Sequence, residues 1–199
     1  MTKILLATNN RGKIIELEDL LKELGLELIL PSDIGLNMDV LEDGRTYSDN
    51  ARKKAAAFAA GCGFLALADD SGLEVQALGG KPGLHSKRYT SELDASDADR
   101  RALLIKNLRG KARPWRADFH AAVAIADPAG GVTVANGICP GEIIPEQRGT
   151  GGFGYDPIFL VDGTGKTMAE LSLDEKNRLS HRARALANAI PTIKKLISS

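Results

Sequence analysis

Residues 3–30 read KILLATNNRGKIIELEDLLKELGLELIL and alternate between two kinds of pattern. Lys3 and the four apolar residues that follow it predict a buried strand, and Thr8-Asn9-Asn10 predict the turn after that strand. Leucines and isoleucines then recur at three- and four-residue spacing, and Gly25 ends the predicted helix. The last five residues predict a second strand, which Pro31 stops. This order of strand, helix and strand indicates the α/β class.

Downstream, helices continue and the strands become longer. Ser48 or Asp49 is expected to cap a helix that runs to about Ala60, and an apolar strand at 64–68 is expected to end abruptly at Asp69. The remaining predicted elements are a helix at 97–109, a strand at 115–126, a hairpin turn at 127–131, a strand at 132–134, a helix opened by the capping-box pair Ser172 and Glu175, and a short terminal helix after Pro191. These elements predict a mixed α/β fold.

The composition indicates a globular protein without a general affinity for nucleic acids. The 199 residues carry 26 basic and 26 acidic side chains, so the formal net charge is zero. Because aromatic residues make up only 5%, the core is expected to be aliphatic, in one domain or two small lobes. The segment from Arg100 to Arg116 has seven basic residues and no acidic one. We interpret it as a solvated helix end and loop rather than a groove for a polyanion.

Cysteine content and hydropathy bear on the compartment. Two cysteines, Cys62 and Cys139, cannot form a framework of bridges, which fits a reducing environment. The longest uncharged stretch, residues 55–68, is 14 residues long, whereas a membrane-spanning helix needs about 20. The N-terminal apolar run is only four residues, too short for a signal peptide. We therefore expect a cytoplasmic protein with no membrane partner.

The segment from Thr8 to Lys13 suits a phosphate group. It joins a predicted strand to a predicted helix, whose N-terminal amides and partial positive charge favour anions. Lys13 opposes the helix dipole in the first turn, and a bound polyanion would remove that conflict. The alternative is an ordinary loop in which an asparagine caps the helix. Residues alone favour neither interpretation.

The segment Asp69-Asp70-Ser71-Gly72 suits a metal ion at the end of a strand. Adjacent carboxylates at a strand end are a typical ligand position in α/β sheets, and Mg²⁺ relieves their repulsion. If the strand continued through them, their side chains would point to opposite faces and only one would address a substrate. The alternative is a polar turn between two strands. Glu42 is a candidate third carboxylate, with a solvated loop position as its alternative.

Two later segments suit a nucleoside. Residues 149–157 contain four glycines, which allow close backbone approach, and two aromatic residues, Phe153 and Tyr155, which offer a stacking face for a base. Residues 176–182 read KNRLSHR, and Lys176 shares a helix face with Ser180. His181 and Arg182 would project about 100° apart on one regular helix. Both reach one pocket only if the helix breaks near Ser180.

Taken in order, the motifs closely resemble the inosine triphosphate pyrophosphatase family, whose bacterial members are called dITP/XTP pyrophosphatases. They are TNNxGK, EDGxTYxxNA, ADDSGL, LGGxPG, GTGGFGYDP and EKxxxSHR, and the resemblance extends from Lys3 to about Leu186. The resemblance implies a single domain over residues 1–199 with a central mixed β-sheet flanked by helices, two lobes and an active-site cleft between them. It also implies a homodimer that uses Mg²⁺ to hydrolyse the triphosphates ITP, dITP and XTP to the monophosphate and pyrophosphate.

The resemblance also assigns roles residue by residue. Asp70 matches the catalytic acidic residue, which also meets the metal, and Glu42 matches a metal-associated glutamate. The triphosphate would be held by Thr8, Asn9, Asn10, Arg11, Gly12, Lys13, Lys54 and Ser71. The nucleoside would be held by Phe153, Gly154, Tyr155, Asp156, Lys176, His181 and Arg182. At position 41 a leucine stands where some members carry a second glutamate, so the metal would rest on fewer carboxylates.

Selectivity follows from hydrogen bonding at position 6 of the purine. Hypoxanthine and xanthine carry an acceptor there, whereas adenine carries a donor, so donor-only side chains such as Arg182 and Lys176 would favour the first two. Three alternatives to a pyrophosphatase stay open. They are a sensor that binds nucleotide without turnover, a phosphatase that releases orthophosphate, and an RNA-binding module that uses the basic segment Arg100 to Arg116.

Overall fold

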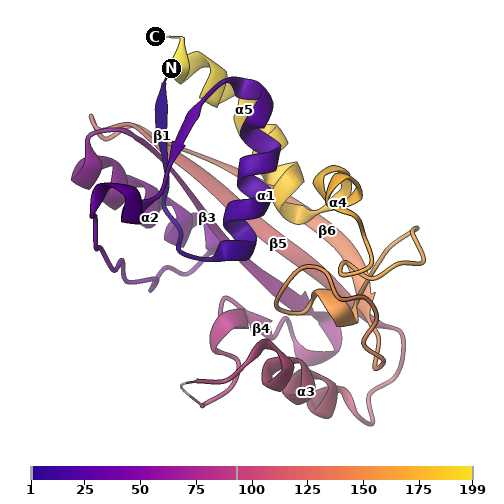
Figure 1. The fold of residues 1–199 in the computed structure, drawn as a ribbon. Coiled ribbons are helices and arrows are strands. Elements are labelled where there is room, and N and C mark those ends of the chain that lie inside the picture. Colours follow the sequence, from indigo (N-terminus) through magenta and orange to yellow (C-terminus); the bar gives the residue numbers. More distant parts are fainter. Residues whose placement is uncertain (1, 93, 199) are drawn as a thin grey trace. The chain divides into compact units, whose positions relative to one another are not determined.

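A computed structural model describes residues 2–92 and 94–198 of the chain (Figure 1). Within these ranges the strands are β1 Lys3–Leu6, β2 Glu27–Ile29, β3 Leu65–Val75, β4 Pro82–Gly83, β5 Trp115–Ala126, β6 Val132–Ile143 and β7 Phe159–Val161. The α-helices are α1 Arg11–Leu21, α2 Tyr47–Cys62, α3 Asp97–Leu108, α4 Leu173–Leu179 and α5 His181–Ile197. No helix in the described part of the chain is long and apolar enough to cross a membrane.

The strands form one mixed sheet, as the sequence predicted. Its order is β2-β1-β3-β5-β6-β7, and β4 pairs with β3 off this path. Strand β1 runs parallel to both β2 and β3, whereas β3 with β4 and β6 with β7 are antiparallel pairs. The parallel part corresponds to the strand–helix–strand pattern of residues 3–30, and the antiparallel part to the later hairpins.

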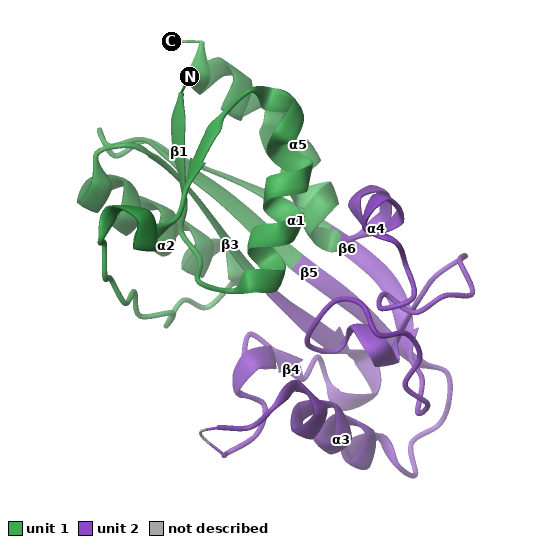
Figure 2. Ribbon diagram, viewed as in Figure 1, with its two compact units in different colours: residues 1–70, 121–137, 181–199 green, residues 71–120, 138–180 purple. Residues whose placement is uncertain are grey.

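The chain divides into two compact units, coloured separately in Figure 2. Unit 1 comprises residues 1–70, 121–137 and 181–199, and unit 2 comprises residues 71–120 and 138–180. Strands β3, β5 and β6 each contribute residues to both units. The helices α1, α2 and α5 belong to unit 1, and α3 and α4 belong to unit 2.

Unit 1 has a core on each face of its part of the sheet. Alternate residues of a strand point to opposite faces, so neighbouring residues of β1 and β5 enter different cores. On one face Ile4 and Leu6 pack with leucines of α1 and with the alanine-rich face of α5. On the other face Leu5 and Ala7 pack with Phe58 and the alanines of α2. The aliphatic core that the composition predicted is therefore present in this unit.

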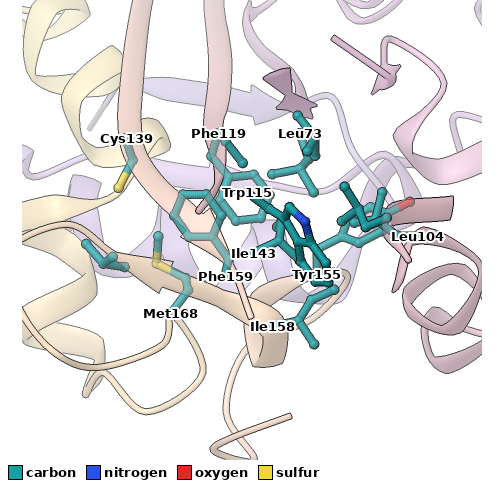
Figure 3. Packing of buried hydrophobic residues seen from close by; sticks show 14 of the residues in the cluster. Leu73, Leu104, Trp115, Phe119, Cys139, Ile143, Tyr155, Ile158, Phe159 and Met168 are labelled. Atoms are coloured by element: carbon teal, nitrogen blue, oxygen red, sulfur yellow. The ribbon is translucent and has the colours of Figure 1, made fainter. Parts of the chain in front are cut away.

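Unit 2 has a single core that contains most of the aromatic side chains of the chain. Figure 3 shows Trp115 and Phe119 of β5 beside Phe159 of β7, together with Tyr155 from the glycine-rich loop. The rings of Phe119 and Phe159 have centroids 4.4 Å apart. Leu104 of α3 packs against the same cluster, so this helix is fixed to the loop residues that follow β6.

Strand β3 does not end at Asp69, which corrects the sequence prediction. It continues through Asp70, Ser71 and Gly72 to Val75. The pattern suggested a stop because two carboxylates rarely occur inside a strand. In the structure the first carboxylate is neutralised by cations from two helices, so the strand continues. The two side chains consequently face opposite sides, as expected for a strand that persists.

Two helix boundaries also differ from the predictions. Helix α2 is capped by Thr46, whose side chain accepts from the Asp49 amide in a capping box, so the cap lies before Ser48. Pro191 does not interrupt the terminal helix, since α5 runs unbroken from His181 to Ile197. Pro191 and Ala187 are both exposed, so the carbonyl group that loses its helical partner faces water.

Pro191→Ala should therefore stabilise the protein, because it restores one helical hydrogen bond without disturbing a packed face. We expect the free energy of unfolding to rise by about 1–2 kcal/mol, less than the intrinsic helix penalty of proline because the unfolded chain also gains freedom. Urea unfolding of both proteins measures the difference. A loss of stability would instead show that a kink at Pro191 supports the packing of α5.

Candidate functional site

The turn after β1 is organised by Asn10, which caps α1. Its side-chain oxygen accepts from the backbone amides of Gly12 at 3.0 Å and Lys13 at 3.2 Å. The backbone amide of Asn10 donates to Thr8 Oγ1 at 3.1 Å. The capping role that the sequence held open is confirmed. Asn9 and Arg11 are exposed.

A buried cluster of four charges lies beneath this turn. Asp69 of β3, only 1% exposed, forms ion pairs with Lys13 of α1 and with Arg182 of α5. Arg182, also 1% exposed, forms a further ion pair with Glu16 of α1. Two carboxylates thus face two cations inside unit 1. The cluster connects three elements that are far apart in sequence.

Charge balance in the cluster explains the titration behaviour of its members. Burial alone raises the pKa of Asp69, but Arg182 and Lys13 outweigh it and hold the pKa below the ordinary value. Burial also lowers the pKa of Lys13, with Asp69 acting in the opposite direction. Asp69 is therefore a permanently ionised group at neutral pH.

Two lysines from different helices converge on the backbone of Asp69. The ammonium groups of Lys13 and Lys54 each donate to the Asp69 carbonyl oxygen, at 3.3 Å in both cases. Lys54 of α2 also forms an ion pair with Glu42, which lies in the loop before this helix. Three of the residues predicted for the triphosphate and metal are thus brought together in unit 1.

Asp70 points away from the buried cluster and is partly exposed. Its Oδ2 accepts from the Asn50 side chain of α2 at 3.0 Å. The pKa of Asp70 is raised above its ordinary value, mainly by burial and also by the nearby charge of Glu42. The Asn50 hydrogen bond and the two lysines act in the opposite direction but do not outweigh burial. A half-buried carboxylate beside two ammonium groups and a second carboxylate can bind a divalent cation or accept a proton from water.

Asn50 is a residue of the site that sequence reasoning did not assign. It is 2% exposed, and its side-chain oxygen accepts from the Gly44 amide at 2.7 Å. Asn50 therefore ties the loop that carries Glu42 to the carboxylate of Asp70. The sequence did contain a signal for Asn50, because it is a polar residue of the motif EDGxTYxxNA at the start of an alanine-rich helix. Only the fold reveals which groups it contacts.

The nucleoside candidates of unit 2 form a second group. Lys176 of α4 forms a buried ion pair with Asp156 at 2.7 Å, and its ammonium group lies 5.3 Å from the centroid of the Phe153 ring. Asp156 also accepts from the Phe153 amide at 3.0 Å. Tyr155 is buried in the core, where its hydroxyl donates to the Ser86 carbonyl oxygen at 2.9 Å. Tyr155 thus anchors the loop, whereas Phe153 is half-exposed.

The break that the sequence required near Ser180 is present. Helix α4 ends at Leu179, Ser180 has extended backbone angles, and α5 begins at His181. His181 and Arg182 are buried in unit 1, whereas Lys176 belongs to unit 2. The Arg182 guanidinium donates to carboxylates in this structure, and a direct contact with a base stays a prediction, as does the cleft between lobes.

The fold and these charges define a mixed α/β protein in which lysines of two helices converge on the backbone of one strand. The profile of the Ham1 family matches residues 4–192. The chain belongs to the Ham1 family, which confirms the resemblance drawn from the motifs.

Known relatives match nearly the whole chain. A dITP/XTP pyrophosphatase of Desulforamulus reducens is 46% identical over 195 residues, covering 98% of this chain and 96% of the relative. A dITP/XTP pyrophosphatase of Thermus thermophilus is 46% identical over 185 residues, covering 92% of this chain and 88% of the relative. The solved structure of a HAM1 protein from Coxiella burnetii matches with a TM-score of 0.85 and 36% identity over 100% of this chain and 99% of that one. The solved structure of the Ham1 protein of Staphylococcus aureus matches with a TM-score of 0.82 and 36% identity, covering 99% of this chain and 98% of that one.

The buried cluster makes a stability prediction. Glu16→Ala leaves Arg182 with one carboxylate fewer in a buried position, and breaking such a pair typically costs about 3–5 kcal/mol. We expect a loss of that order in urea unfolding, and a smaller loss for Glu16→Gln, which keeps an acceptor for Arg182. Glu18→Ala, an exposed position on the same helix, is the matched control. If Glu16→Ala behaved like this control, the cluster would not stabilise the fold.

Proposed function

We propose that this protein hydrolyses deaminated purine nucleoside triphosphates, namely ITP, dITP and XTP, to the nucleoside monophosphate and pyrophosphate. Such an activity removes non-standard purines from the nucleotide pool. The observation that carries the proposal is the convergence of Lys13 and Lys54 beside Asp70. This arrangement occurs in a chain that matches proteins named dITP/XTP pyrophosphatase almost from end to end.

The two lysines suit the triphosphate. Phosphoryl transfer depends mostly on positioning and on neutralising charge, rather than on covalent help from the protein. Lys13 and Lys54 are held by α1 and α2 with their ammonium groups at the same carbonyl oxygen, so they present two positive charges at one place. Thr8, Asn9, Arg11, Gly12 and Ser71 complete the proposed phosphate side.

Asp70 and Glu42 fit the Mg²⁺ that the proposal includes. Mg²⁺ usually binds through one or two carboxylates together with water and substrate phosphates, rather than in a cage made only of protein groups. The described residues contain no group of three or more His, Cys, Asp or Glu side chains that could hold a metal ion. Asp70 and Glu42 interact electrostatically, and their repulsion raises the pKa of Asp70. When bound there, the ion would neutralise phosphate charge and orient the phosphates.

Asp70 is the proposed catalytic base. Its Oδ2 is engaged by Asn50, which fixes the orientation of the carboxylate. Asp70 would accept a proton from a water whose oxygen attacks the α-phosphorus. A new phosphorus–oxygen bond forms, the bond from the α-phosphorus to the bridging oxygen breaks, and pyrophosphate leaves intact. A carboxylate with a pKa raised by burial is a better base than an exposed aspartate.

The nucleoside side of the proposal rests on unit 2. Phe153 offers a ring for stacking, and Lys176 carries only donors, which suits the carbonyl at position 6 of hypoxanthine and xanthine. Asp156 holds this lysine in a buried position, so pairing it with the wrong purine would leave buried polar groups mismatched. The proposal retains contacts of His181 and Arg182 with the nucleoside. A homodimer and a cytoplasmic location also belong to it, and sedimentation would test the dimer.

Product analysis tests the reaction. The protein is incubated with ITP and Mg²⁺, with ATP and GTP alongside, and the products are separated by chromatography. We expect inosine monophosphate and pyrophosphate, with ATP and GTP largely spared. Inosine diphosphate and orthophosphate would show that the wrong bond was assigned. Tight binding without turnover would favour a nucleotide sensor.

Asp70→Asn tests the proposed base. The amide keeps the shape of the side chain but cannot accept the proton, so we expect kcat for ITP to fall by about 10²- to 10⁴-fold. Circular dichroism and urea unfolding serve as the controls for folding. A decrease of less than about fivefold would exclude this role for Asp70, because a positioned base contributes more than that.

Asn50→Ala tests the group that orients Asp70. The variant loses the donor to Asp70 and the acceptor for the Gly44 amide, so we expect kcat to fall roughly tenfold, in keeping with the loss of a hydrogen bond to a charged group. Arg52→Ala, an exposed position on the same helix, should retain wild-type kcat. Equal rates in the two variants would argue that the orientation of Asp70 does not depend on Asn50.

A further inference from the structure

The backbone of Gly154 is held at both its amide and its carbonyl group by one helix. Its amide donates to Asp97 Oδ2 of α3 at 2.7 Å. Its carbonyl oxygen accepts from Arg101 Nη1 of the same helix, also at 2.7 Å. Asp97 and Arg101 are four residues apart in α3, so both side chains leave the same face of the helix. We call this arrangement the Gly154 clamp.

The two side chains of the clamp are themselves held in place. Arg100 Nη2 donates to the other carboxylate oxygen of Asp97 at 2.6 Å. Arg101 Nε donates to Gln147 Oε1 at 2.9 Å. Burial raises the pKa of Asp97, but Arg100 and the Gly154 amide outweigh it and hold the pKa below its ordinary value. Asp97 is therefore an ionised acceptor, and hydrogen bonds to charged groups are stronger than neutral ones.

Gly154 occupies a critical place in the glycine-rich loop. It adopts φ of 60°, a left-handed conformation that favours glycine, and follows Phe153 directly. The peptide groups around Phe153 are thus held by Asp156 on one side and by α3 on the other. Tyr155, the next residue, is fixed in the core shown in Figure 3. The clamp consequently sets the direction in which the half-exposed Phe153 ring is presented.

We propose that Asp97 and Arg101 are specificity-determining positioning residues, which hold the nucleoside loop through Gly154 so that Phe153 and Lys176 can discriminate purine bases. This inference rests on the proposed function. Neither residue needs to contact the substrate. Their action passes through the backbone of Gly154, and a shift of that peptide would move the ring and the Lys176 ammonium group that lies over it.

The clamp also accounts for part of the basic segment from Arg100 to Arg116. Arg100 and Arg101 are turned toward Asp97 and Gly154, so two of the seven basic residues are explained by the loop they hold. Arg116 pairs with Asp162. Only the later part of the segment, including Lys106 and Lys111, is exposed as the sequence led us to expect. A groove for a polyanion is not needed to explain the first turn of α3.

Arg101→Met and Asp97→Ala test the proposal. Both remove one arm of the clamp, and Arg101→Lys and Asp97→Asn are conservative variants that keep a donor or an acceptor. Lys106→Ala, exposed on the same helix, is the matched control. The readouts are kcat/KM for ITP and ATP with Mg²⁺, inhibition by inorganic tripolyphosphate, and thermal unfolding. Tripolyphosphate reports the phosphate side without a nucleoside.

We expect Arg101→Met and Asp97→Ala to lower the ratio of kcat/KM for ITP over ATP by roughly tenfold or more, as expected for loss of a charge-assisted hydrogen bond. Inhibition by tripolyphosphate should change by less than about twofold, which corresponds to about 0.4 kcal/mol in binding free energy. The conservative variants should recover part of the ratio. Lys106→Ala should retain the wild-type ratio.

A lower unfolding temperature with an unchanged ITP-to-ATP ratio would overturn the proposal, because the clamp would then be purely structural. If Arg101→Met failed to fold, the comparison would rest on Asp97→Ala, which removes the other arm of the clamp, and an unchanged ratio there would overturn the proposal. If the wild-type protein did not hydrolyse ITP, the proposed function would fail. The clamp would then be tested by calorimetric affinities for ITP and ATP, where equal ratios in wild type and Asp97→Ala would overturn it.

Discussion

The ion pairs of Asp69 with Arg182 and Lys13 are the interaction on which the rest of unit 1 depends. Burying an isolated carboxylate costs several kcal/mol, so β3 can pass through Asp69 only if cations accompany it. Those cations come from α1 and α5, and both helices pack on the same face of the sheet. The charge requirement and the apolar core therefore select the same arrangement of strand and helices.

Continuation of β3 through both aspartates divides their tasks. Asp69 faces the buried cluster, and its pKa is held low, whereas Asp70 faces the other side, and its pKa is raised. Adjacent residues of one chemical type thus acquire opposite electrostatic surroundings from the period of a strand alone. The first organises the lysines that the triphosphate would meet. The second stays available for chemistry, oriented by Asn50.

Local patterns predicted the elements whose signals are local. The strand–helix–strand order of residues 3–30, strand β5 and the capping box at Ser172 all appear where the sequence placed them. The predictions were wrong where a distant group decides the outcome. A strand through Asp69 needs Arg182, which lies 113 residues away, and Pro191 is tolerated because its side of α5 is exposed. Asn50 and Arg101 were missed because their partners, Asp70 and the Gly154 carbonyl, meet them only in the folded chain.

In the proposed function, the two units would control different properties by different physical means. In unit 1, charges converge on one place, and Coulomb attraction varies slowly with distance, so the proposed phosphate affinity would tolerate small displacements. In unit 2, the proposed recognition of a base would depend on hydrogen bonds that weaken steeply with angle, so the backbone itself must be fixed. Side chains of α3 fix it at Gly154, whose left-handed φ of 60° favours glycine. Substitutions in α3 should therefore change which purine is accepted while leaving attraction for the triphosphate intact.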